Sequence, residues 1–194
     1  AFLDGRCDAA ARFCIQGLRL NVTDEGVQVV ERVLEAGNPS NWRAVVHMGL
    51  EDRAKGLKIE VAALNNRASD NTTVYPTAPP ILPTTVDLGK LALDPTQATG
   101  EIWSRDAGHY YCNEIFYRSL HAVRRAAAAA GVGGNAAARA GAGAGAGPRQ
   151  LLPVVFVHLP EDTGGNTIAH MADMVTTIIA TIMQDDNLRQ FDRL

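Results

Sequence analysis

The run Val154-Val155-Phe156-Val157 restricts the fold of this chain more than any other segment. It is short and wholly apolar, and His158, Leu159 and Pro160 follow it. Such a run predicts a buried strand, which ends at Pro160 because proline cannot donate a ladder hydrogen bond. A sheet built around a strand of this kind needs cover on both faces.

Other strands and helices are predicted to alternate along the chain. Strands are expected where apolar residues alternate or form short runs, over residues 15–22, 44–48, 57–64 and 100–104. Helices are expected from Asp24 to the stop signal Gly37-Asn38-Pro39, over residues 82–93, and from residues 106–112 to about Arg125. Polar or proline-rich stretches predict surface loops over residues 65–73 and 76–83.

The last predicted helix carries one apolar stripe. Its apolar residues recur at steps of three and four, at Ile168, Met171, Val175, Ile178 and Ile182. This spacing predicts a helix that packs on the core, and a dimerisation seam is the alternative interpretation.

An alternation of strands and helices is typical of the α/β class, in which helices cover both faces of a sheet. Ligands of such sheets bind beyond the carboxyl ends of the strands. We therefore expect the chemistry of this chain just after His47, Ser104 and His158.

Composition excludes several classes of protein. The 194 residues fit one domain, and a net charge of −3, from 18 basic and 21 acidic residues, argues against a nucleic-acid partner. The longest apolar stretches fall well short of 18 residues, so no membrane span is expected. The three cysteines, Cys7, Cys14 and Cys112, lack metal-type spacing, and no signal peptide is recognisable. These features favour a reducing compartment and a cytoplasmic protein.

Residues 126–147 break the pattern, because 19 of these 22 residues are Ala or Gly. The first alanines prolong the preceding helix, and the Gly-Ala part is expected to be a flexible, linker-like insertion. The segment from Gly131 to Ala136 matches the dinucleotide pattern G-x-G-x-x-A. The match lies after a helix and before a strand, the reverse of the required order, so we expect no nucleotide site there.

Cys112 is the candidate nucleophile. It lies near the start of a predicted helix, where unpaired N–H groups and the helix dipole favour an anion. A thiol in this position has a lowered pKa and is more nucleophilic. A buried, inert cysteine is the alternative interpretation.

His158 is the candidate base, because a histidine at the carboxyl end of an apolar strand is not needed for packing. His47 ends a similar strand, and we interpret it as a structural residue. His109 lies three residues before Cys112, so the two could form a zinc pair, but no second close pair completes the ligand set.

A carboxylate that orients the imidazole would complete a thiol–imidazole site. Glu60 lies between apolar residues in Lys58-Ile59-Glu60-Val61-Ala62, so partial burial is expected, and a buried acid needs a partner. Asp70 and Asp106 are alternatives.

Three separated segments resemble one known family. Ser104–Leu120, SRDAGHYYCNEIFYRSL, resembles the cysteine signature of the pyroglutamyl peptidase I family, also called pyrrolidone carboxyl peptidases. The segment Val155–Pro160 resembles its histidine segment. The glutamate segment of the family is similar to a third stretch, which comprises His47-Met48-Gly49, Glu60, Ala62, Asn65 and Asp70-Asn71. Leu82-Pro83 resembles the start of the helix before the cysteine strand.

The resemblance implies a single peptidase domain over residues 1–194 that removes N-terminal pyroglutamate from peptides. It implies Cys112 as nucleophile, His158 as general base and Glu60 as the residue that orients the base. The implied fold is a three-layer α/β/α sandwich around a twisted, mostly parallel mixed sheet, with no metal or organic cofactor. Tyr110 and Tyr111, next to the nucleophile, are candidates for the wall of the substrate pocket. The oligomeric state stays open.

The sequence departs from the family in two places. Residues 1–5 do not match the family's N-terminal Thr-Gly-Phe-x-Pro-Phe, so either that strand is absent from this sequence or the chain is a divergent member. Leu50-Glu51-Asp52-Arg53 stands where many bacterial members have Gln-Ala-Gly-Gly. The alternatives are an inactive homologue or binding module, another thiol hydrolase such as an amidase or deglycase, and a zinc protein.

Overall fold

A computed structural model of the chain describes residues 2–7, 14–37, 41–91, 102–130, 151–163 and 166–191. Its strands are β1 (Phe2–Cys7), β2 (Cys14–Leu18), β3 (Val45–Leu50), β4 (Lys58–Glu60), β5 (Ala62–Leu64), β6 (Ile81–Pro83), β7 (Trp103–Ser104) and β8 (Val154–Leu159). Its α-helices are α1 (Val29–Ala36), α2 (Tyr111–Ala129) and α3 (Ile168–Phe191), and its short 3₁₀ turns are η1 (Gly26–Gln28) and η3 (Leu88–Lys90).

The central sheet has the strand order β3-β8-β4-β7. The strand β8 runs parallel to β3 and antiparallel to β4, and β4 runs parallel to β7. Two of the three pairings are therefore parallel. Two small antiparallel pairs, β1–β2 and β5–β6, accompany the central sheet.

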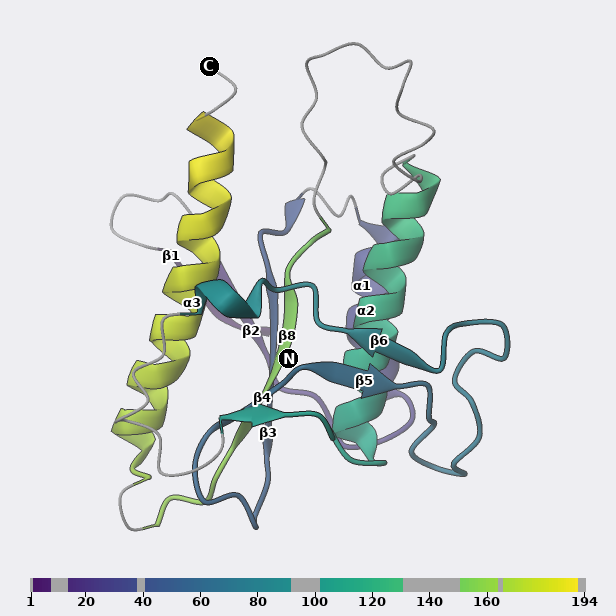
Figure 1. Cartoon of the computed structure of the whole chain (residues 1–194), viewed down its shortest axis with the longest axis horizontal. Helices are drawn as coiled ribbons and strands as arrows, with labels where there is room; N and C mark the ends of the chain where they lie inside the picture. The colour runs from purple at the N-terminus through teal and green to yellow at the C-terminus, as the bar shows by residue number, and fades with distance from the viewer. Residues whose placement is uncertain are drawn as a thin grey trace.

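Alternate residues of β8 enter two separate cores. Val154 and Phe156 pack in a cluster with residues of α1 and α2, whereas Val155 and Val157 pack in a cluster with residues of α3. Figure 1 shows β8 between α3 on one side and α1 and α2 on the other. The expected three-layer α/β/α sandwich around a mostly parallel mixed sheet is thus confirmed.

A buried ionic cluster joins α1 to α2. Arg118 Nη1 lies 3.1 Å from Glu31 Oε2, and Arg118 Nη2 lies 2.7 Å from Glu114 Oε1. The hydroxyl of Tyr75 donates a hydrogen bond to Glu31 and accepts one from Arg118 at 3.1 Å. Glu114 Oε2 also accepts a hydrogen bond from the backbone N–H of Ala68 at 2.7 Å. The cluster ties the loop before β6 to both helices.

Most predicted elements are present, with shifted ends. The strand predicted over residues 57–64 is two strands, β4 and β5, and the predicted strand over 15–22 ends at Leu18. The helix predicted from Asp24 begins later, at Val29, and Thr23 Oγ1, not Asp24, accepts the N–H of Gly26 at the start of the preceding turn η1. The loop predicted over 76–83 contains β6.

Two predictions about secondary structure are wrong. The helix predicted over residues 82–93 is absent from the described part, residues 82–91, which contains only β6 and the turn η3. Thr84 and Thr85 explain this: their hydroxyls donate to the carbonyls of Val154 and Leu152, which ties the chain to the start of β8 in extended form. The strand β3 is parallel as predicted, but it is an edge strand of the described sheet, and only His47 in it is buried.

Cys14 is disulfide-bonded, and its Cα partner in the β1–β2 pair is Cys7. Disulfides are uncommon in reducing compartments, so this bond counts against the reducing compartment that the sequence favoured. The cytoplasmic localisation is a prediction only. Among the described residues, no helix has the length and apolar character that a membrane span requires. Of the predicted insertion over residues 126–147, residues 126–129 belong to α2, and residues 131–147 lie outside the described residues.

Ile178 tests whether α3 packs on the sheet. Its side chain is fully buried, whereas Ile168 on the same helix is 67% exposed. We expect Ile178→Ala to lower the free energy of unfolding by about 2–5 kcal/mol. Urea denaturation measures this, with Ile168→Ala as the matched control, for which the change should stay below about 1 kcal/mol. Equal effects of the two substitutions would contradict the core-facing orientation.

Candidate active site

The site residues share one face of the central sheet. Residue Gly49 of β3 lies opposite His158 of β8, and Glu60 of β4 lies opposite Phe156. Residues opposite one another on neighbouring strands point to the same face, and Phe156 packs toward α2. His158 and Glu60 therefore extend toward the layer that contains α2.

Cys112 reaches this face of the sheet from α2, of which it is the second residue. A tight turn leads from β7 into the helix: Asp106 Oδ1 accepts the N–H of Gly108 at 2.9 Å, and Gly108 has the positive φ of 78° that glycine tolerates. Asn113 then fixes the helix start, because its side-chain amide exchanges two hydrogen bonds, of 2.8 and 2.9 Å, with the backbone of Leu64.

Cys112, His158 and Glu60 form a line of contacts. His158 Nδ1 lies 2.7 Å from Glu60 Oε1, and Cys112 is the other side chain whose proximity raises the pKa of His158. Because Nδ1 faces Glu60, Nε2 is the ring nitrogen left for the thiol. Glu60 is fully buried and His158 is 6% exposed. The structure brings together the three residues that the sequence analysis selected for the thiol–imidazole site.

The surroundings of His158 act on its pKa in opposite directions. Burial lowers the pKa, but hydrogen bonds with Cys112 and Glu60 and the charges of both groups raise it, to about 9. The ring of Phe156 lies 4.7 Å from the His158 ring, centroid to centroid, and supports it from the core side. The arrangement favours the protonated form of the imidazole, which a thiolate–imidazolium pair requires.

Gly49 leaves the space that the sulfur occupies. A Cβ atom at this position would lie 3.0 Å from Cys112 Sγ and 2.9 Å from Phe156 Cζ. The glycine in His47-Met48-Gly49 is therefore part of the site, although it carries no functional group.

The two tyrosines have different surroundings. Tyr110 is 59% exposed and precedes the first turn of α2, and its ring makes an edge contact with the ring of Tyr111. The pKa of Tyr111 is raised, by desolvation and by a hydrogen bond with Asp24. Tyr110 is thus the freer of the two for contact with a ligand.

The alternative residues lie elsewhere. His47 is buried, its Nε2 lies 3.0 Å from Ser119 Oγ, and burial lowers its pKa to about 4, which agrees with a structural role. The side chains of Asp70 and Asp106 accept hydrogen bonds within their own loops, from Thr72 and Gly108. His109 is exposed.

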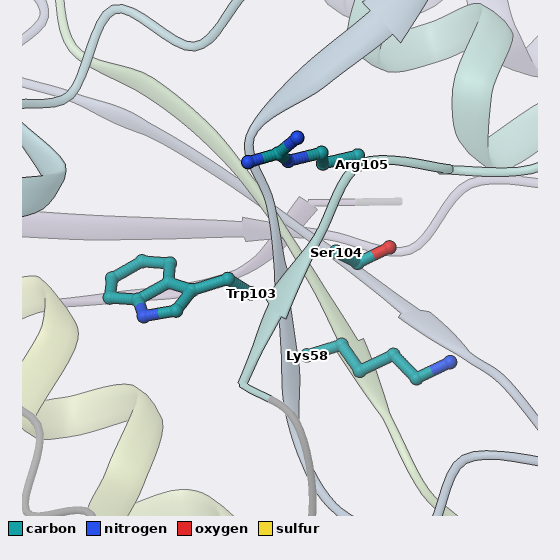
Figure 2. A pocket seen from close by; sticks show the side chains of 4 residues that line it. All are labelled: Lys58, Trp103, Ser104 and Arg105. Atoms are coloured by element: carbon teal, nitrogen blue, oxygen red, sulfur yellow. The ribbon is translucent and has the colours of Figure 1, made fainter.

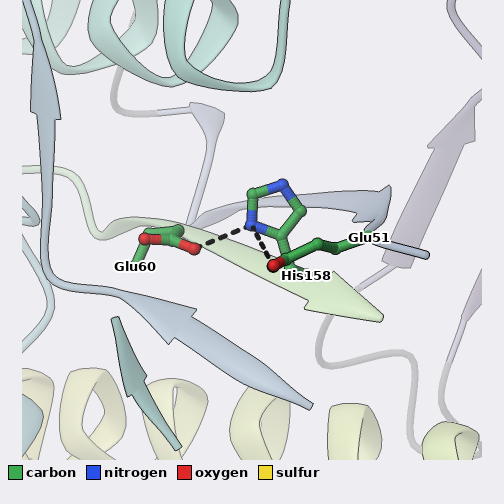
Figure 3. Close-up of side chains that lie close together, drawn as sticks. All are labelled: Glu51, Glu60 and His158. Atoms are coloured by element: carbon green, nitrogen blue, oxygen red, sulfur yellow. Dashed lines mark hydrogen bonds and ion pairs between the residues drawn. The ribbon is translucent and has the colours of Figure 1, made fainter. Parts of the chain in front are cut away.

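Sequence reasoning missed Glu51 as a neighbour of the site. Its Oε2 lies 3.9 Å from His158 Nδ1 (Figure 3), and its Oε1 lies 2.6 Å from Lys58 Nζ. Among the described residues, Glu51, Glu60 and His158 are the set whose ligand atoms lie within 4.8 Å of one another, as a metal ion requires. Glu60 Oε1 already pairs with His158 and Glu51 Oε1 with Lys58, so we assign no metal to this set.

A cavity of about 290 Å³ lies at the edge of the sheet beside β7. Figure 2 shows the four residues that line it, Lys58, Trp103, Ser104 and Arg105. The lining contains none of the predicted site residues, but it includes the lysine that pairs with Glu51.

Comparisons with known proteins identify the fold. The chain is 20% identical to a pyrrolidone carboxyl peptidase from Pyrococcus furiosus, with a TM-score of 0.57 and coverage of 86% of this chain and 80% of that one. For the Thermus thermophilus enzyme the identity is 20% and the TM-score 0.57, over 82% and 79% of the two chains. For pyroglutamyl peptidase I from Bacillus amyloliquefaciens the identity is 13% and the TM-score 0.60, over 84% and 74%.

This chain has the fold of the pyrrolidone carboxyl peptidases. No family model and no curated protein sequence matches it. The resemblance noted in three short segments is thus confirmed for the fold, and it extends over most of the chain.

The raised pKa of His158 predicts a loss of stability at alkaline pH. A protonated group stabilised in the folded state contributes fully below its unfolded pKa of about 6.5. We expect the free energy of unfolding to fall as the pH rises from about 6.5 to about 9, by at most about 3 kcal/mol. Urea denaturation across this range measures the slope. The double variant His158→Gln/Glu60→Gln should lack this slope. An unchanged slope in that variant would show that His158 is not its source.

Gly49→Ala tests the close approach of the sulfur to β3. The added methyl group would meet the buried Phe156 ring and Cys112 Sγ, so we expect a loss of stability of about 1–3 kcal/mol. Gly89→Ala is the control, because there the new Cβ would have one neighbour within 4 Å, Asp87 Oδ1 at 3.4 Å. A well-tolerated Gly49→Ala, measured by urea denaturation, would show that the contact is looser than described.

Proposed function

We propose that the protein is a cysteine peptidase that removes N-terminal pyroglutamate (5-oxoproline) from peptides. The observation that carries the proposal is the contact line Cys112–His158–Glu60. It lies on a fold shared with solved pyrrolidone carboxyl peptidases. Chain segments far apart in sequence contribute the three groups, and each group has a defined role in acyl transfer.

The first half of the reaction forms an acyl-enzyme. The Cys112 thiolate attacks the carbonyl carbon of the pyroglutamyl residue, and the oxygen becomes an anion. The free N–H groups at the start of α2 stabilise this oxyanion, each donor by about 3 kcal/mol. Protonated His158 gives its proton to the leaving amine as the carbon–nitrogen bond breaks.

The second half of the reaction releases the product. Neutral His158 takes a proton from water as the oxygen attacks the thioester carbon. The carbon–sulfur bond then breaks, pyroglutamate leaves and the thiolate–imidazolium pair is restored. Glu60 holds the imidazole in one tautomer through Nδ1 and stabilises its charge in both halves. These steps need no metal or organic cofactor.

The substrate ring is a neutral lactam, so its pocket needs apolar walls and a few hydrogen-bonding groups. An ordinary N-terminus carries an ammonium group whose desolvation is costly, which gives a physical basis for discrimination. We propose the exposed Tyr110 as a wall of this pocket and Tyr111 as its support. The proposed partners are peptides with an N-terminal pyroglutamate.

Cys112→Ala and Glu60→Gln test the proposed mechanism. Release of a fluorogenic amine from a pyroglutamyl amide should be abolished in Cys112→Ala, which lacks the nucleophile, a fall on the order of 10⁶-fold. In Glu60→Gln the dyad survives with a poorly held imidazole, so weak activity should remain, about 10³–10⁴-fold below the unsubstituted protein. Asp106→Asn is the control and should keep most of the activity.

Full turnover by Cys112→Ala would rule out the thiol mechanism. Substrate choice tests the specificity separately, by comparison of pyroglutamyl, alanyl and glutaminyl amides. Equal rates on the three would favour another thiol amidohydrolase, and a folded protein with no turnover on any of them would favour a binding module.

A further inference from the structure

Glu51 presents a second carboxylate to the imidazole of His158. Its Oε2 lies 3.9 Å from Nδ1, the same nitrogen that lies 2.7 Å from Glu60 (Figure 3). The two acids come from different segments, since Glu60 ends β4 and Glu51 follows β3. The mechanism proposed above gives Glu51 no role.

The backbone fixes the place of Glu51. Its N–H donates to the carbonyl of Leu159 at 2.9 Å, which extends the pairing of β3 and β8 by one residue. Its carbonyl accepts the N–H of Ala54 at 3.0 Å in the turn that follows. The side chain is therefore held next to the end of β8, where His158 lies.

Lys58 competes with His158 for the same carboxylate. Its Nζ lies 2.6 Å from Glu51 Oε1, and the side chains of both residues are 30% exposed. In the β4–β8 pair Lys58 lies directly opposite His158, so both point to the same face of the sheet. Glu51 thus lies between a permanent cation and an imidazole that gains and loses a proton.

We propose that Glu51 is a positioning residue that holds the protonated imidazole of His158 together with Glu60, and that Lys58 limits its effect. The inference rests on the proposed function for its catalytic meaning, but the interaction itself does not depend on turnover. The titratable groups that face this imidazole are Glu60 from β4, Cys112 from α2 and Glu51 from the end of β3, with Lys58 behind Glu51.

The signs of the two substitutions differ. Glu51→Gln removes an anion near the imidazolium, so the pH midpoint of His158 should fall by about 0.2–0.7 pH unit, the range expected for a partly exposed ion pair. Lys58→Met frees the same anion from its other partner, so the midpoint should rise by a similar amount. A merely structural tether between Glu51 and Lys58 would respond to both losses in the same direction.

Nuclear magnetic resonance of the ring carbons of labelled histidine measures the midpoint directly in the full chain, with the His158 signal assigned through His158→Gln. Asp52→Asn is the matched control, because it removes one exposed negative charge from the next residue. Its shift should be less than half that of Glu51→Gln. Shifts of the same sign in Glu51→Gln and Lys58→Met, or no shift in Glu51→Gln, would overturn the proposal.

Turnover separates this proposal from the proposed function. In an active peptidase, the alkaline limb of kcat/KM on a pyroglutamyl amide should move with the midpoint, down in Glu51→Gln and up in Lys58→Met. Opposite midpoint shifts without any turnover would support the role of Glu51 and refute the peptidase. If the protein turns over substrate and the alkaline limb of kcat/KM stays unchanged in both variants, the role of Glu51 is refuted. The proposed peptidase function is then unaffected.

Discussion

The contact between Glu60 and His158 is the constraint on which the rest of the site depends. A fully buried carboxylate loses several kcal/mol of hydration, and a partner cation with good geometry must offset that loss. His158 can do so because β8 and β4 are antiparallel and place both side chains on one face. The register of the two strands thus sets the ion pair, and the ion pair favours the protonated imidazole beside the thiol.

The elements around that pair limit its movement. The cluster of Arg118, Glu31 and Glu114 joins α1 to the helix that carries Cys112, two and six residues along α2 from the thiol. Removal of one partner from a buried pair of this kind typically costs about 3–5 kcal/mol. Ion pairs as well as apolar packing therefore hold the first turns of α2. This restricts the movement of the Cys112 sulfur.

Sequence patterns predicted the helices and strands whose formation depends on the order of neighbouring residues. The apolar run before His158 and the start of a helix near Cys112 are strong local signals, and both elements formed where expected. The prediction of a helix over residues 82–93 was wrong, because the hydroxyls of Thr84 and Thr85 bond to a segment distant in sequence and hold this stretch extended. Glu51 was missed for a similar reason. Its role depends on the pairing of β3 with β8, and no spacing along the chain reports how two strands align.

The bare backbone at Gly49 also bears on reagents that would label Cys112. On the β3 side, the sulfur is so close to the strand and to the Phe156 ring that even one methyl group would crowd it. A covalent adduct must therefore grow outward from that wall. The reacting carbon of an electrophile must likewise reach the sulfur from a side other than β3.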